Sequence, residues 1–317
     1  MTNSLLMRKT KKQFVSLLRA IFLLAFAFIL IYPVIFMIAE SVKIQSDTLN
    51  PAVKWFSLAP TLYSYKVAWI SMDYLHSLIN TVTFELISAV IEVFVCAVYA
   101  YGLARFKFRL KKVLMFFLIL SILVPDIMLI IPRITNFRYM DLFGILGLFK
   151  NITGIDLRVN ITDTVLTFYF PSILGVGLKG GLFIYIYMQF FKGLPNELEE
   201  AAWLDGAGPV KTFFSIIIPS SGVVILTVFI FSVIWHWNDW LLATMYMSDH
   251  HTLAYMIKNI QEFITQAWTS KLIATSQSLY YGAPMAACLM FIAPPMVLYL
   301  FLQKHFIASI DRVGIVG

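Results

Sequence analysis

The sequence predicts an all-α, polytopic membrane protein with six transmembrane helices. Hydrophobic residues occupy 60% of the 317 positions, charged residues occupy only 13%, and the mean hydropathy is +0.82. Soluble globular domains of this length carry a much larger polar fraction. The apolar stretches are also continuous rather than alternating, which favours helices over the strands of a membrane barrel.

The predicted spans follow from the length of these stretches. A helix needs about 20 mostly apolar residues to cross a hydrocarbon core about 30 Å thick. The segments that meet this requirement are residues 20–39, 78–103, 113–132, 165–191, 220–240 and 279–302. The first segment is too long for the core of a signal peptide, so we expect it to be retained. We therefore expect a single transmembrane domain over residues 1–317.

The basic residues predict which side of the membrane each connection faces. Lys and Arg cluster within residues 1–19 and again from Arg105 to Lys112. Because cytoplasmic segments carry an excess of Lys and Arg, we place both termini, the 192–219 connection and the 303–317 tail in the cytoplasm. The net charge of +7 then reflects membrane topology and attraction to anionic lipid, and we expect no nucleic-acid partner.

Motifs for catalysis and metal binding are absent from the sequence. It contains no GxxxxGK[ST] phosphate loop, no HExxH motif and no GxSxG motif. Cys96 and Cys288 fall inside predicted spans without metal-binding spacing, and His250–His251 has no third ligand at helical spacing. We expect no catalytic residue and no metal site, and we expect that the chain does not hydrolyse ATP itself.

A polar segment interrupts the apolar chain between the fourth and fifth spans. Asn196 followed by Glu199 has the pattern of a capping box, and an acidic first turn favours the positive end of a helix dipole. Gly206 can adopt the left-handed conformation that ends a helix, and Gly208–Pro209 can start a second helix. We expect a short helix, a glycine turn and a second short helix on the cytoplasmic side.

The first of these short helices carries a face of mostly small side chains at helical spacing. Its residues are Leu198, Ala201, Ala202 and Asp205. Small residues allow another backbone to approach closely, so we expect this face to point outward, toward a protein partner. In the second helix Phe213, Phe214 and Ile217 are expected to anchor the segment against the membrane spans.

The same segment resembles a known motif. Glu200-Ala201-Ala202 with Gly206, followed by Ile216, Ile218 and Pro219, matches the fixed positions of the EAA motif in permease subunits of binding-protein-dependent ABC importers. Other segments look like the carbohydrate-uptake branch of that family, the maltose-importer second-permease type. They are 101–108 (YGLARFKF), 123–125 (LVP), 189–195 (QFFKGLP) and 237–240 (WNDW).

The resemblance implies a mechanism and a set of partners. In that family the EAA segment is a coupling helix that sits in a cleft of a separate cytoplasmic ATPase, which binds ATP and magnesium, so this chain needs no cofactor of its own. The coupling residues would be Glu200, Ala201, Ala202, Asp205, Gly206 and Pro219. The other partners would be a second permease subunit in a heterodimer, a second copy of the ATPase and an extracytoplasmic solute-binding protein. The complex would import a sugar or short oligosaccharide by alternating access.

Two alternatives stay open at this stage. The solute of such a permease need not be a sugar, and a proton-coupled secondary transporter could use the intramembrane carboxylates. The chain also departs from the family pattern, because it lacks the usual glycine-rich tail with a basic residue before the last glycine. In addition, Glu85, Glu92 and Asp126 stand where such permeases commonly carry apolar or small residues.

Charged residues inside the spans point to the solute path, because they are costly in lipid and usually face a cavity or a partner. Glu85 and Glu92 are seven residues apart on one helix face, where they either line the path or pair with a second permease subunit. Lys179 lies among Pro171 and several glycines, and broken helices open backbone groups toward a cavity. We expect Lys179 to contact the solute; the alternative is that it snorkels to the outer interface.

The outer end of the fifth span combines aromatic and polar residues. Trp237, Asn238 and Asp239 suit a glycan, since aromatic faces stack on sugar rings and the polar groups bond to hydroxyls. An aromatic belt at the headgroups is the alternative for the tryptophan. Arg133, Arg138 and Lys179 leave room for an acidic saccharide.

Overall fold

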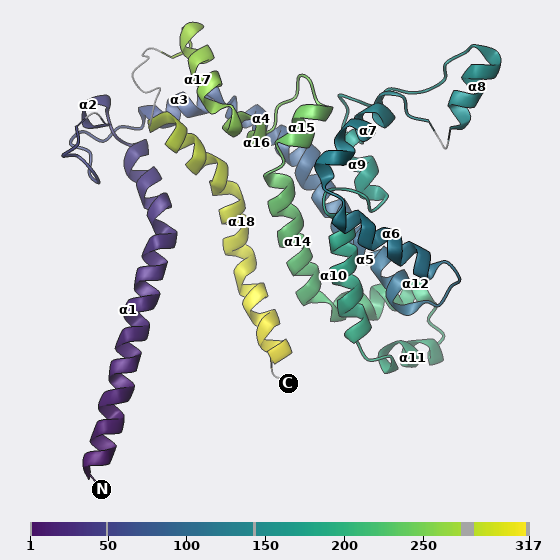
Figure 1. Ribbon diagram of the computed structural model, residues 1–317, viewed down its shortest axis with the longest axis horizontal. Coiled ribbons are helices and arrows are strands. Elements are labelled where there is room, and N and C mark those ends of the chain that lie inside the picture. Colours follow the sequence, from purple (N-terminus) through teal and green to yellow (C-terminus); the bar gives the residue numbers. More distant parts are fainter. Residues whose placement is uncertain (1, 49, 142–143, 274–281, 315–317) are drawn as a thin grey trace. The chain divides into compact units, whose positions relative to one another are not determined.

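The computed structural model describes residues 2–48, 50–141, 144–273 and 282–314 (Figure 1). In these ranges the chain is helical, and its only β-structure is an isolated bridge between Met140 and Val159. The predicted all-α fold is therefore confirmed. The chain divides into two compact units, Met1–Met72 with Ile260–Phe291 and Asp73–Asn259 with Ile292–Gly317.

The first unit contains a long apolar helix and a small helical core. Its helices are α1 (Thr2–Ser41), α2 (Gln45–Thr48), α3 (Tyr63–Ser71), α17 (Ile260–Thr269) and the first part of α18 (Gly282–Gly314). Helices α3 and α17 pack together through the buried residues Val67, Ile264 and Ala267. The apolar sequence of α1 continues without a break through Pro33, as expected for the first span.

The loop between α1 and α3 is held by two buried charged side chains. Lys43 donates from Nζ to the carbonyls of Val53 and Lys54 at 2.9 and 3.0 Å. Asp47 accepts at Oδ2 from the Ser57 hydroxyl at 2.6 Å and from the Leu58 amide at 2.8 Å. These bonds give the loop a defined shape although it contains almost no regular structure.

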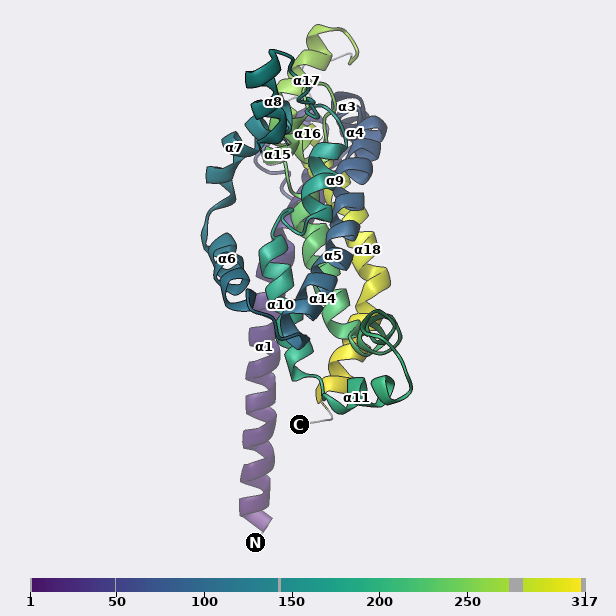
Figure 2. The same ribbon diagram turned by 90° about the vertical axis from the view of Figure 1, so that its right-hand side faces the viewer.

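The second unit is built around one central helix. It contains α4 (Tyr74–Asn80), the π-helical segment η1 (Thr81–Leu86), α5 (Ile87–Arg105), α6 (Lys111–Leu123), α7 (Asp126–Arg138), α8 (Ile145–Thr153), α9 (Leu166–Ile173), α10 (Gly180–Gly193), α11 (Glu197–Leu204), α12 (Pro209–Thr212), the π-helical segment η2 (Phe213–Ile217), α13 (Ile218–Ser220), α14 (Gly222–Trp237), α15 (Leu241–Tyr246) and α16 (Leu253–Lys258). Helix α5 packs against α9, α10 and α14 (Figure 2). Small residues of α5, such as Ala97 and Ala100, face the large buried side chains Phe183 and Tyr187 of α10.

The described helices support three to five membrane spans by length and composition. Lys12–Ser41, Tyr74–Arg105 and Gly282–Lys304 each suffice alone. Lys111–Leu123 with Asp126–Arg138, and Pro209–Ser220 with Gly222–Trp237, satisfy the same criteria only as pairs bent by 107° and 82°. The predicted count of six is therefore not confirmed, and the predicted start of the last span at Leu279 lies outside the described residues.

Two predicted spans are broken for identifiable reasons. Pro125 holds Val124 in an extended conformation, so α6 ends there and α7 starts in a new direction. Residues 165–191 form α9 and α10 rather than one helix, because the connecting turn places both Gly175 and Lys179 at positive φ, +69° and +67°. A helix cannot continue through left-handed residues. Lys179, a residue with a Cβ, is thus held in a sparsely populated conformation at the start of α10.

Candidate functional site

The polar segment between α10 and α14 folds as the expected helix, turn and second helix. Helix α11 ends in a left-handed Gly206 with φ of +77°. The Ala207 amide donates to the Ala202 carbonyl at 2.9 Å, and the Gly206 amide donates to the Trp203 carbonyl at 3.0 Å. This pair of bonds is the Schellman motif. Pro209 then begins α12, as predicted.

The predicted capping box at Asn196 is wrong. Asn196 has helical dihedral angles and its side chain makes no capping bond to α11. Its Oδ1 instead accepts from Nη1 of Arg105 at 2.5 Å, while Nη2 of Arg105 donates to the Leu194 carbonyl at 2.8 Å. A guanidinium forms stronger, charge-assisted hydrogen bonds than a backbone amide does, so the distant arginine outcompetes the local cap.

Glu199, the other half of the expected capping box, also turns toward Arg105. Its Oε1 lies 2.7 Å from Nε of Arg105, and both side chains are almost fully buried. Burial raises the pKa of the Glu199 carboxyl, and the neighbouring Arg105 opposes that rise only in part. Arg105, the last residue of α5, thereby binds three groups of the polar segment and fixes it to the central helix.

The outward face of α11 differs in one residue from the predicted face. Leu198, Ala201 and Asp205 are exposed as expected, whereas Ala202 is buried against the rest of the segment. Glu200 is also exposed. Leu204 at the end of α11 is 89% exposed and Val210 in α12 is 72% exposed. Leu204 and Val210 therefore add apolar area to the exposed surface of this segment.

The second half of the segment anchors it as predicted. Phe213 and Ile217 are buried in the core around α5, and Phe213 lies against Tyr101 with ring centroids 5.1 Å apart. Phe214 is half exposed and stacks on Phe94. Pro219 is exposed one residue before the bend into α14. Figures 1 and 2 show that α11 lies at one end of the group formed by α5, α10 and α14, and that α15 and α16 lie at the other end.

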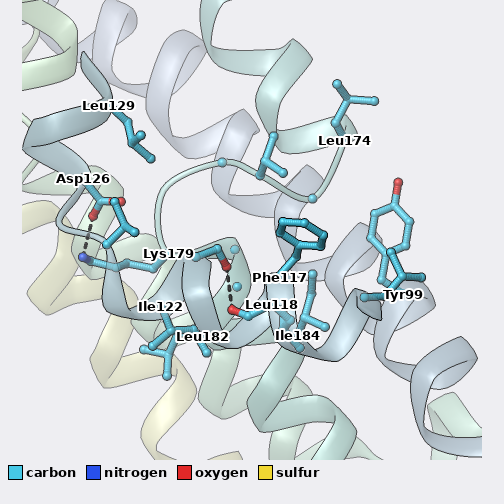
Figure 3. A pocket seen from close by; sticks show the side chains of 18 of the residues that line it. Tyr99, Phe117, Leu118, Ile122, Asp126, Leu129, Leu174, Lys179, Leu182 and Ile184 are labelled. Carbon is cyan, nitrogen blue, oxygen red and sulfur yellow. Dashed lines mark hydrogen bonds and ion pairs between the residues drawn. The ribbon is translucent and has the colours of Figure 1, made fainter. Parts of the chain in front are cut away.

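A cavity of about 510 Å³ lies between α6, α7 and the turn that joins α9 to α10. Most of its lining is apolar, and Figure 3 shows Phe117, Ile122, Leu182 and Tyr99 around it. Its polar groups belong to Ser121, Asp126, Arg133 and Lys179. A largely apolar cavity with a few convergent polar groups is the usual form of a small-molecule site.

Lys179 lines this cavity and is paired within the chain. Its Nζ lies 2.5 Å from Oδ2 of Asp126, and both side chains remain about one-third exposed (Figure 3). The same Nζ lies 5.9 Å from the centre of the Trp235 ring. The structure therefore brings together two of the charges that the sequence singled out, Lys179 and Asp126.

The residues at the C-terminal end of α14 lie outside this cavity. Trp237 is buried, and the exposed Asn238 donates its side-chain amide to the Ile234 carbonyl at 2.7 Å. Neither residue lines the large cavity. Asp239 accepts at Oδ1 from the amides of Leu241 and Leu242 at 3.1 and 3.0 Å. Asp239 also lines a second, much smaller cavity of about 20 Å³.

Glu85 and Glu92 bind a histidine that sequence reasoning passed over. His236 of α14 lies between them, with Nδ1 2.8 Å from Glu85 Oε2 and Nε2 3.0 Å from Glu92 Oε2. The two carboxylates are 1% and 0% exposed. Each of them is therefore paired with the same histidine of this chain. The signal that could have revealed His236 is an isolated imidazole within an apolar span opposite two carboxylates.

Comparison with known proteins identifies the fold and the family. Residues 93–312 match the family described as the binding-protein-dependent transport system inner membrane component. A chain of a bacterial ABC transporter involved in the import of the acidic polysaccharide alginate has the same fold, with a TM-score of 0.68 at 18% identity. The similarity covers 93% of this chain and 97% of that chain.

Two relatives of similar length are proteins of Bacillus subtilis (strain 168). The melibiose/raffinose/stachyose import permease protein MelC is 28% identical over 287 residues, which cover 90% of this chain and 91% of the relative. The polygalacturonan/rhamnogalacturonan transport system permease protein YtcP is 26% identical over 295 residues, which cover 90% and 92%. The chain therefore belongs to the binding-protein-dependent transport system inner membrane components, the non-catalytic permease subunits of ABC importers.

Proposed function

We propose that this permease imports a sugar or short oligosaccharide, with acidic saccharides as its preferred solutes, and that Lys179 contacts the solute during passage. The observation that carries the proposal is the cavity beside the α9–α10 turn, in which Lys179 and Arg133 lie among apolar side chains. No helix runs through this turn, and Gly175, Val176, Gly177 and Lys179 of the turn line the cavity.

The charges of the cavity support an anionic solute. The Lys179 ammonium forms an ion pair with Asp126, and a carboxylate of the solute can replace Asp126 as the partner of that cation. Arg133 forms no ion pair among the described residues, and the hydrogen bond from its Nη2 to the Val176 carbonyl is long, at 3.4 Å. Its guanidinium can therefore bind a carboxylate with two parallel hydrogen bonds. The Trp235 ring beside Lys179 offers an aromatic face to a sugar ring.

The relatives support the same solute class. One is named for the import of melibiose, raffinose and stachyose, another is named for the transport of polygalacturonan and rhamnogalacturonan, and the structural neighbour is involved in the import of the acidic polysaccharide alginate. Glu85 and Glu92 do not favour a proton-coupled secondary transporter, because both are enclosed and neither lines the large cavity.

The partners in this proposal follow from the polar segment. The exposed face of α11, with Glu200, Ala201 and Asp205, would bind a cytoplasmic ATPase that holds ATP and magnesium. The complete complex would contain a second permease subunit, two ATPase subunits and an extracytoplasmic solute-binding protein. Both termini would then lie in the cytoplasm, on the same side as α11.

The test is uptake by the assembled complex in membrane vesicles, with acidic and neutral oligosaccharides as separate substrates. We expect Lys179→Ala to lower uptake of the acidic substrate by about tenfold, which corresponds to about 1.4 kcal/mol, and to affect the neutral substrate less. Lys192→Ala, an exposed lysine near the other end of α10, is the matched control. Normal uptake by an assembled Lys179→Ala complex would refute the role of Lys179. Uptake that stops with an uncoupler but survives ATP depletion would refute the ATP-driven mechanism.

A further inference from the structure

His236 stands between two enclosed carboxylates, and this geometry fixes how many protons they share. Glu85 belongs to η1, Glu92 to α5 and His236 to α14, and none of the three is more than 4% exposed. Both ring nitrogens of His236 are within hydrogen-bonding distance of a carboxylate oxygen, at 2.8 and 3.0 Å. Each contact of this length between two such atoms requires one proton between them.

A neutral histidine cannot provide both protons. Neutral imidazole carries one N–H and one bare nitrogen, and an ionised carboxylate is only an acceptor. With a single proton, the bare nitrogen would face a carboxylate oxygen with no hydrogen between them. Two lone pairs in contact without water are strongly unfavourable in a medium of low dielectric. A second proton is therefore required, either on the imidazole or on one of the carboxyl groups.

The surrounding charges favour the same second proton. Arg133 of α7, Asp239 beyond the end of α14 and the Tyr246 hydroxyl of α15 line the 20 Å³ cavity together with Glu85 and His236. Asp126 of α7 is already paired with Lys179, at the start of α10, and Cys96 of α5 lies one turn from Glu92. Two carboxylates, Glu85 and Asp239, thus share this small cavity with one arginine, Arg133, and Glu92 lies on the other side of the His236 ring. A proton added to this group reduces its excess negative charge.

The position of Glu92 links these three side chains to the broken helix. Its other oxygen, Oε1, has no hydrogen-bond partner among the described residues and lies against the α9–α10 turn. A Cβ added at Gly177 or Gly180 would fall 2.8 or 2.7 Å from that oxygen. The carboxylate therefore occupies the space left by two glycines of the turn that carries Lys179. A shift of Glu92 changes the support of that turn.

We propose that Glu85, His236 and Glu92 form a proton-binding site inside the permease, which holds two protons when α14 is locked to η1 and α5. Loss of one proton leaves the imidazole neutral and both carboxylates ionised, so one of the two hydrogen bonds breaks. The link between α14 and α5 then weakens, and the turn beneath Lys179 loses its support. Transport should accordingly decline as the pH rises. The expected decline of transport with rising pH rests on the proposed import function, whereas the proton-binding site itself does not.

Glutamine at position 92 distinguishes a proton requirement from simple packing. In Glu92→Gln the amide NH₂ donates to Nε2 of a neutral imidazole, while Nδ1–H donates to Glu85. Both hydrogen bonds then form without the second proton. We expect Glu92→Gln to keep uptake within about twofold of wild type near neutral pH. Glu92→Ala removes one partner of His236 and should lower uptake by at least about tenfold.

The pH profile supplies the decisive comparison. Above its midpoint, wild-type uptake should fall by about tenfold per pH unit, as for the loss of a single proton. The Glu92→Gln complex should lack this decline, although it contains the same ATPase and binding protein. Glu262→Gln, on the exposed side of α17, is the matched control and should follow the wild-type profile. A Glu92→Gln profile identical to wild type, or a flat wild-type profile, would overturn the proposal.

A second measurement does not depend on transport or on the stability of a variant. Nitrogen NMR of the ¹⁵N-histidine-labelled wild-type complex reports the ring protons, and His236→Asn identifies the signal. We expect a doubly protonated His236 ring, or a singly protonated ring together with one protonated Glu85 or Glu92 carboxyl in the infrared spectrum. A singly protonated ring with both carboxyl groups ionised would overturn the proposal. If the complex gives that result and still imports its solute, the proton site is refuted and the proposed function is not.

Discussion

The guanidinium Nε of Arg105 lies 2.7 Å from Oε1 of Glu199, and this ion pair joins the end of α5 to α11. The same arginine holds the side chain of Asn196 and the carbonyl of Leu194. A force applied to α11 therefore acts directly on the helix at the centre of the second unit.

Arg105→Ala should separate α11 from α5. Removal of one partner from a nearly buried pair leaves the other charge uncompensated, which costs about 3 kcal/mol. We expect faster amide hydrogen exchange in Glu197–Leu204 and a lower ratio of solute imported to ATP hydrolysed. Arg109→Ala, an exposed arginine four residues later, is the control. Unchanged exchange in α11 would show that the segment does not depend on Arg105.

Gly206 should tolerate no residue that disfavours a left-handed backbone. At φ of +77°, Gly206→Ala should destabilise the turn by about 1 kcal/mol. Gly206→Pro should do more damage, because proline cannot reach this φ and also removes the amide that bonds to Trp203. We expect ATP hydrolysis without matching uptake. Gly208→Ala is the control, since Gly208 has φ of −77° and open space around it. Normal coupling in Gly206→Pro would contradict the role of this turn.

The two end glycines of α10 should respond differently to alanine. A Cβ at Gly180 would lie 2.6 Å from the Gly175 carbonyl oxygen, which is backbone and cannot rotate away, whereas a Cβ at Gly193 meets nothing. Gly180→Ala should therefore destabilise the protein by about 1–3 kcal/mol and reduce uptake. Gly193→Ala should change neither. The thermal unfolding temperatures of the two purified complexes provide the comparison, and equal values would contradict the packing of the α9–α10 turn.

The loop after α1 should loosen in acid. The Ser57 hydroxyl is the main cause that lowers the pKa of Asp47 below its ordinary value of 3.8, and the Leu58 amide adds to it. A lowered carboxyl pKa contributes stability above the ordinary value, and this stability is lost as the pH falls through the lowered pKa. We expect hydrogen-exchange protection of the Leu58 amide to disappear at a pH below 3.8.

The Val53 amide provides an internal control for this experiment. It donates to the Asn50 carbonyl in the same loop and has no carboxylate partner. Its protection should change less with acid than that of Leu58. Asp47→Asn should lower the protection of Leu58 at neutral pH and remove most of its pH dependence. Protection that persists in acid would show that Asp47 does not hold the loop.

Local backbone chemistry explains which parts of the fold could be predicted. Gly206 and Pro209 act through their own dihedral angles, so the turn after α11 is readable from sequence. The cap at Asn196 failed because its competitor, Arg105, is 91 residues away in the chain. The helix breaks at Pro125 and near Lys179 turned expected straight spans into bent or separate helices.

Residues of the candidate site could be predicted where a single residue is energetically costly at its position. Lys179, Glu85 and Glu92 were recognisable because charge inside a span is expensive. Their partners Asp126 and His236 depend on how distant helices pack, which no local pattern specifies. Arg105 looked like one more cytoplasmic basic residue, although three of its nitrogens bind the polar segment.

Residues Tyr74–Arg105 form one continuous helix. Glu85 and Arg105 are twenty residues apart, about 30 Å along the axis at 1.5 Å per residue, which matches the thickness of the hydrocarbon core. Arg105 is bound to α11, and Glu85 is bound to α14. A displacement of either residue can therefore reach the other along one helix, without passing through a loop. A movement of α11 would therefore reach the contact between Glu85 and His236 along one continuous helix.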